Sequence, residues 1–316
     1  MRSAWSLFLS RLACSFCAAG VIGACSKGEA IGVDQSSDTG ASGYCRTTTC
    51  PFPKGYPTAE GQCEPANWSD SDTCRQAGES NAPLWWRTAC VGYDLNAAAG
   101  SGLSYADFSA AADGAFSAWT NATCPSTTSD TRVSIDVRDL GPVTCAKAEY
   151  DETGPNQNVI VFHDDAWPYE AADVAATDTP KSLTIALTTV SYDKETGELL
   201  DADIELNSAD YTFTTSAAAT GELGESFDLQ SVLTHETGHF LGLAHSPLTR
   251  AVMNASGDTD SGGTKRALAL EDVLGICSIY TASGERNVST LAASSGTLAE
   301  GSCDPTPHGG FSSTCN

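Results

Sequence analysis

HETGHFLGLAHS, residues 235–246, holds three of the five histidines in this chain of 316 residues. If the stretch is helical, His235 and His239 lie one turn apart and their side chains point in the same direction. Gly242 follows where such a helix can end, because glycine adopts the left-handed conformation of a helix stop without strain. The chain can then turn back and bring His245 to the same place. The spacing therefore predicts a helix and a turn whose three imidazoles converge on one point.

Three neutral imidazoles that converge in this way are typical of a metal site. Three nitrogens and one water satisfy the tetrahedral preference of Zn²⁺, and the position held by water is open to a substrate. Glu236 follows the first histidine directly, so its side chain is rotated off the line of the ligands and toward the open position. A carboxylate there can accept a proton from zinc-bound water and later return it to a leaving amine. We predict that His235, His239 and His245 hold zinc, and that Glu236 is the general base of a peptide-hydrolysing enzyme.

The longer pattern H-E-x-x-H-x-x-G-x-x-H resembles the motif of the metzincin zinc peptidases. Ser246, directly after the third histidine, is similar to the matrixin branch of that group. Met253 stands eight residues past His245, where matrixins carry a methionine in a tight turn below the zinc. The resemblance implies that Met253 packs beneath the ligands without binding the metal. Matrixins usually have Tyr-Pro after this methionine, whereas Asn254 and Ala255 stand here, so their specificity cannot be transferred.

A second, structural zinc site of the matrixins has no complete counterpart in this chain. His163 lies roughly where one of its ligands would be, but the strand expected at 199–206 offers Asp201, Asp203 and Glu205 instead of a histidine. Carboxylate oxygens suit calcium better than zinc. Two interpretations follow, a calcium site at these three residues and a solvated acidic loop, of which the acidic loop is favoured.

Apolar periodicity predicts the order of the secondary structure in a catalytic domain over 83–282. It predicts strands at 86–96, 132–137, 158–162, 183–192 and 199–207, and helices at 104–121, from Asp228 into the histidine motif, and at 268–280. This order of strand, helix, four strands and two helices indicates an α+β fold, and metzincin domains have the same order. The resemblance therefore implies a five-stranded twisted mixed sheet with three helices. It also makes 183–190 the edge strand above the cleft, to which an extended peptide would add.

The first residues have the pattern of an export signal, which we assign to 1–24. Two arginines accompany a short apolar run that ends in small residues and is too short for a membrane-spanning helix. Ile22–Cys25 resembles the cleavage box of bacterial lipoproteins, in which the cysteine becomes the lipidated first residue. A plain signal peptide and membrane anchoring through a lipidated Cys25 are both open. Either predicts an extracellular or cell-surface location.

Three further segments flank the catalytic domain. Residues 25–44 are small and polar, which predicts a flexible tether. Residues 45–82 hold four cysteines among Pro, Gly and Ser, which predicts a disulfide-stapled segment that serves as spacer, surface binder or prosegment. Residues 283–316 form a polar tail with a candidate local disulfide between Cys303 and Cys315. Scattered cysteines of this kind indicate an oxidising compartment.

The charge of the chain limits its partners. With 16 basic and 40 acidic residues, the net charge of −24 repels phosphate backbones, so a protein or peptide substrate is expected and nucleic acid is not. The sequence does not predict an oligomeric state. The alternative function is a surface-anchored binding module that keeps zinc for structure alone. Glu236 argues against that alternative, because a structural zinc site does not require this carboxylate.

Overall fold

The computed structural model describes residues 18–26, 44–47, 83–125, 131–169, 184–193, 196–217, 226–246, 248–255, 264–286 and 303–311. Most of the predicted tether and of the cysteine-rich segment 45–82 lies outside the described residues, as does Cys315. Among the helices within the described residues, none has the length and apolar character needed to cross a membrane.

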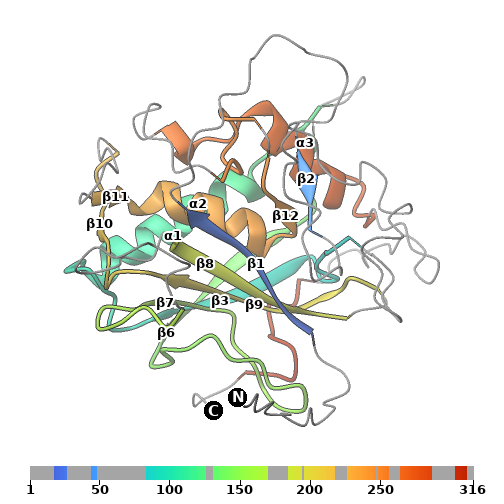
Figure 1. Ribbon diagram of the computed structural model, residues 1–316. Helices are drawn as coiled ribbons and strands as arrows, with labels where there is room; N and C mark the ends of the chain where they lie inside the picture. Colours follow the sequence, from blue (N-terminus) through green and yellow to red (C-terminus); the bar gives the residue numbers. More distant parts are fainter. Residues whose placement is uncertain are drawn as a thin grey trace, which may run out of the picture.

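A mixed sheet forms one layer of the molecule (Figure 1). Its strands are β3 (Cys90–Asn96), β6 (Asp136–Val143), β7 (Val159–Phe162), β8 (Thr184–Tyr192) and β9 (Leu199–Leu206), in the spatial order β6-β3-β7-β9-β8. β6, β3, β7 and β9 are parallel, and β8 runs antiparallel to β9. The predicted five-stranded mixed sheet is therefore confirmed. A further strand, β1 (Ala18–Ser26), pairs antiparallel with the outer edge of β8 and spans the end predicted for the export signal.

Three helices complete the predicted α+β fold. α1 (Tyr105–Thr120) and α2 (Leu229–Phe240) cover one face of the sheet, and α3 (Leu270–Ile279) lies beyond α2 (Figure 1). α1 and α2 pack directly on each other, because the Phe116 and Phe240 rings meet edge to face at 5.1 Å between centroids. The Trp119 indole of α1 also donates to Thr234 O of α2 at 2.8 Å. Through these contacts α1 holds the helix that carries the histidine motif against the sheet.

Three pairs of short strands and one 3-10 helix lie outside the large sheet and the three helices in the described residues. They are β2 (Cys45–Arg46) paired with β12 (Leu243–Ala244), β4 (Thr123–Cys124) with β5 (Thr131–Arg132), β10 (Thr212–Thr214) with β11 (Ser226–Asp228), and the 3-10 helix η2 (Thr264–Arg266). The β2–β12 pair is antiparallel and brings the start of the cysteine-rich segment beside the chain that follows α2. The Arg46 guanidinium, which is buried, donates to Leu84 O at 3.1 Å and strengthens that connection.

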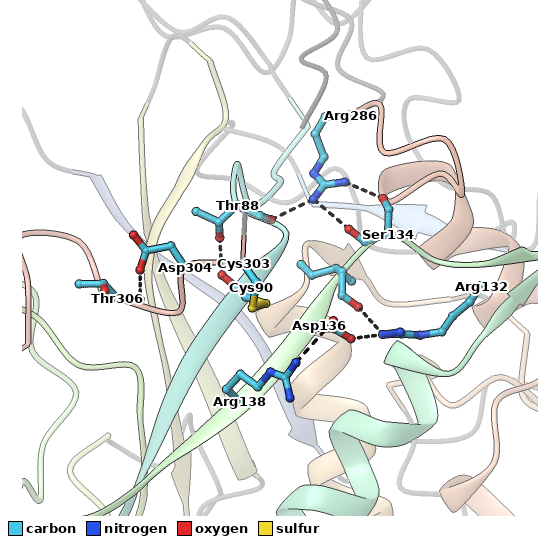
Figure 2. Close-up of a disulfide and its surroundings, with 11 residues drawn as sticks. Thr88, Cys90, Arg132, Ser134, Asp136, Arg138, Arg286, Cys303, Asp304 and Thr306 are labelled. Carbon is cyan, nitrogen blue, oxygen red and sulfur yellow. Dashed lines mark hydrogen bonds and ion pairs between the residues drawn. A yellow bond between two sulfur atoms is a disulfide. The ribbon is translucent and has the colours of Figure 1, made fainter. Parts of the chain in front are cut away.

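The strand predicted at 132–137 is displaced along the chain, since β6 begins at Asp136. The periodic residues Val133 and Ile135 are buried in the core, but the backbone between them is bonded elsewhere. Ser134 N donates to Tyr280 O at 3.2 Å, and the Arg286 guanidinium donates to the main chain and the hydroxyl of Ser134 (Figure 2). β6 is an edge strand with one neighbour, and none of its residues is fully buried, so alternation alone does not identify it.

Two long-range disulfides join pairs of residues that the structure describes. Cys90 of β3 is bonded to Cys303 of the tail (Figure 2), and Cys124 of β4 is bonded to Cys277 of α3. The predicted local bridge between Cys303 and Cys315 is therefore wrong. The tail returns to the body of the domain, where the Asn156 side chain donates to His308 O at 2.9 Å. This return places Cys303 next to Cys90 of β3, which is 213 residues away in the sequence.

Candidate metal centre

α2 ends in a turn that only glycine fits well. Leu241 caps the helix, and Gly242 follows it with φ +99°, in the left-handed region. A Cβ at Gly242 would also lie 2.7 Å from Leu84 O. Both the positive φ and the close approach of the backbone exclude a larger residue. The chain reverses here, and β12 leads it back to His245, as the sequence predicts.

His235, His239 and His245 converge on one point, as predicted. All three are buried, and the Nε2 atoms of His239 and His245 each lie 3.2 Å from His235 Nε2. Ligand atoms of the three residues lie within 4.8 Å of one another. Zinc–nitrogen bonds of 2.0–2.1 Å in a tetrahedron would place two nitrogens about 3.3 Å apart. Two of the three nitrogen–nitrogen distances therefore match the spacing around one zinc ion, and the third is within 4.8 Å.

Backbone carbonyls fix the orientation of two of these rings. His235 Nδ1 donates to Val252 O at 2.7 Å, and His239 Nδ1 donates to Leu243 O at 2.8 Å. A carbonyl only accepts, so the proton is on Nδ1 and the lone pair of Nε2 points at the shared centre. Burial lowers the pKa of His239 to about 4 and holds the pKa values of His235 and His245 well below the usual range. The imidazoles are therefore neutral at pH 7, which is the form that binds a metal.

Met253 lies against α2 next to the ligands. It is buried, and a Cβ at Gly238 would lie 2.2 Å from Met253 Sδ and 2.8 Å from Trp119 Cζ2. Gly238 falls between the first two histidines in the sequence, so the methionine packs on the helix close to them. The Asp272 carboxylate of α3 accepts from Val252 N at 2.8 Å and from Met253 N at 3.2 Å. α3 therefore holds the turn that supports the ligands.

Glu236 is fully buried on α2 beside this centre. Its Oε2 accepts a hydrogen bond of 2.6 Å from the Thr188 hydroxyl of β8. Sequence reasoning identified Glu236 but missed both Thr188 and Asp272. The acidic residue at the first turn of the last helix is a signal for Asp272, because such residues often cap a helix start. Thr188 gives no signal in the sequence, since nothing in the pattern of a β-strand distinguishes one buried threonine from another.

Residues 143–281 match the family model of matrixin, Peptidase M10. The match runs from the end of β6 through α3 and contains the three histidines, Glu236 and Met253. The chain contains a matrixin-like metzincin domain. Matrixins as a class are zinc metallopeptidases, which agrees with the geometry of the three histidines. Among curated proteins, none matches the chain.

The acidic residues of β9 are not the solvated loop favoured from the sequence. Asp201, Asp203 and Glu205 are buried on the sheet, with exposed fractions of 2%, 2% and 3%. The Glu205 carboxylate is already bonded to His163 Nε2, at 2.7 Å, and to the Tyr169 hydroxyl. Within the described residues, the three histidines form the one group of metal-binding side chains, so the calcium site gains no support. A hydrogen-bonded His–Glu–Tyr cluster lies there instead.

Burial favours the neutral form of Asp201 and Asp203. It raises the pKa of Asp201 and of Asp203, and the neighbouring charge of Asp201 raises the pKa of Asp203 further. Val159 N donates to Asp203 Oδ1 at 2.8 Å, which partly opposes these effects. The folded protein therefore favours at least one protonated carboxyl at this position.

Replacing Gly238 by alanine should disrupt the centre, because the added methyl group would overlap Met253 and Trp119. We expect a loss of about 1–3 kcal/mol in the free energy of unfolding, as for other overpacked cores, and weaker zinc binding. The control is Gly114→Ala in α1, where the methyl group meets only the flexible end of the Gln230 side chain. Thermal unfolding and zinc titration measure both effects. Equal stability and zinc affinity in the two variants would contradict the packing described here.

Replacing Asp201 by asparagine should stabilise the protein at high pH. Because the pKa of Asp201 is raised on folding, its favourable contribution is present below the unfolded value of 3.8 and is lost as the pH rises through the folded value. The asparagine side chain stays neutral, so D201N should exceed the wild type by about 1–3 kcal/mol at pH 8 and match it near pH 4. Denaturant unfolding at both pH values, with and without millimolar calcium, measures this. If calcium makes the wild type more stable than D201N, the difference in the free energy of unfolding has the opposite sign. That result would support the calcium interpretation.

Proposed function

We propose that this chain is an exported zinc-dependent endopeptidase in which Glu236 is general base and then general acid. The observation that carries the proposal is the convergence of three buried, neutral imidazoles beside a buried carboxylate. The rings of His235 and His239 are oriented through their Nδ1 atoms, which leaves their Nε2 atoms for the metal, and His245 Nε2 lies 3.2 Å from His235 Nε2. Three protein ligands leave a fourth tetrahedral position open, as in catalytic zinc sites.

Each residue of the centre has a separate role in the proposed reaction. When bound, zinc supplies a Lewis acid that polarises the scissile carbonyl and lowers the pKa of a water. His235, His239 and His245 would hold the ion. Glu236 would accept a proton from the attacking water and pass it to the leaving nitrogen. The mechanism needs no covalent intermediate, because water is the nucleophile.

The substrate would be an extended segment of a protein or peptide that pairs with β8. Support comes from β1, which pairs antiparallel along the outer edge of β8 from Ala18, opposite Tyr192, to Ser26, opposite Thr184. The edge therefore accepts an added strand through backbone hydrogen bonds. Where matrixins usually carry Tyr-Pro after the methionine this chain has Asn254 and Ala255, so we propose no side-chain preference.

We propose an extracellular or cell-surface location. Its support is the export pattern of the first 24 residues and the disulfides Cys90–Cys303 and Cys124–Cys277, which form in oxidising compartments. Lipidation of Cys25 belongs to the same proposal and would tether the enzyme to a membrane.

Removing the carboxylate tests the proposed chemistry. Glu236→Gln should lower the rate of peptide cleavage by about 10²–10⁴-fold, because the general base is lost, while zinc stays bound. The substrate is a mixed library of unfolded peptides, and mass spectrometry reads the products. The control is Glu198→Gln, which changes a glutamate that pairs with the exposed Arg87 outside the centre. Zinc-loaded wild-type protein that cleaves nothing would contradict the proposal and favour the binding-module alternative.

A further inference from the structure

Thr188 joins β8 to the proposed general base. It lies in β8, where it is paired with Ile204 of β9, and its side chain is completely buried. Its Oγ1 is 2.6 Å from Glu236 Oε2 and 3.2 Å from Glu236 O. A hydroxyl has one proton to donate, and the shorter, charge-assisted bond to the carboxylate takes it. The strand therefore donates a hydrogen bond to one oxygen of the carboxylate.

We propose that Thr188 is a positioning residue that assigns different tasks to the two oxygens of Glu236. Oε2 is anchored on the hydroxyl, and this bond fixes the plane of the carboxylate. Oε1 then becomes the oxygen that accepts and returns the proton. The inference rests on the proposed function of Glu236 and adds the residue that aims it.

The rigidity of its surroundings makes Thr188 effective in this role. A glutamate side chain has three rotatable bonds, and a misplacement of about 1 Å in a catalytic group can cost about 100-fold in rate. Thr188 is β-branched, so its own rotamer is restricted. The residues on both sides of Thr188 in β8 are also paired with β9, which holds the backbone of Thr188 in place. The Thr188 hydroxyl on the sheet therefore limits the motion of the Glu236 carboxylate on α2.

The same residue links substrate binding to catalysis. A peptide added to β8 would bond with the backbone of the strand, while the Thr188 side chain points to α2. Its neighbour Thr189 points to the opposite face of the sheet, toward Tyr169. β8 thus offers two adjacent threonines, of which one contacts the proposed base and the other does not.

Three variants of the full-length, zinc-loaded chain test the proposal. Thr188→Val keeps the shape and removes the hydroxyl, Thr188→Ser keeps the hydroxyl, and Thr189→Val removes a hydroxyl from the other face. We expect kcat for a cleaved peptide to fall about 10- to 100-fold in T188V with KM within about twofold, and to stay within about threefold in T188S and T189V. Zinc content should be unchanged in all three.

A loss in T188V that T188S shares, or T188V with kcat within about twofold of wild type, would overturn the proposal. Crystal structures of T188V and T188S supply a readout independent of activity. The Glu236 carboxylate should keep its plane in T188S and turn or become disordered in T188V. An unmoved carboxylate in T188V would also overturn the proposal. A wild-type chain that cleaves no peptide would instead refute the proposed function, and the two failures are therefore distinguishable.

Discussion

The centre depends on one backbone reversal, the left-handed turn at Gly242. Two histidines on a helix can hold a metal only from one direction, and the third must come from chain that has turned back. Gly242 permits this at φ +99° and, having no side chain, leaves room for Leu84 O. The reversal also brings Leu243 O to His239 Nδ1, so the same turn supplies one ligand and orients another.

The centre is held together from outside α2 as well. Val252 O accepts from His235 Nδ1, and the neighbouring amides are bonded to Asp272 of α3. α3 is itself tied to β4 by the Cys124–Cys277 disulfide. The metal ligands thus rest on a chain of contacts through distant parts of the sequence. Such a support limits the motion of the ligands, which a metal site with an open position requires.

The features that the sequence predicts are those in which metal binding fixes the spacing between residues. The interval of four between His235 and His239, the glycine at 242 and the methionine at 253 each follow from local geometry, and all three have the expected places. Four of the five strands and the three helices follow from apolar periodicity, because they have a buried face, whereas the edge strand β6 does not.

The parts that sequence missed are set by contacts between distant residues. The bond between Thr188 and Glu236 depends on how β8 lies under α2, and no local pattern encodes that. Cys303 pairs with Cys90 because the tail returns to the sheet, whereas proximity in the sequence pointed to Cys315. Asp201 and its neighbours were interpreted as solvated from their charge, but burial on β9 depends on the whole sheet.

X-ray absorption at the zinc edge of the full-length chain tests the central claim most directly. The geometry of the three histidines predicts about one zinc per chain, with three imidazole nitrogens at about 2.0–2.1 Å and one oxygen from water. A closed shell of four protein ligands, sulfur in the shell, or less than stoichiometric zinc would contradict an open catalytic centre built by α2 and the Gly242 turn.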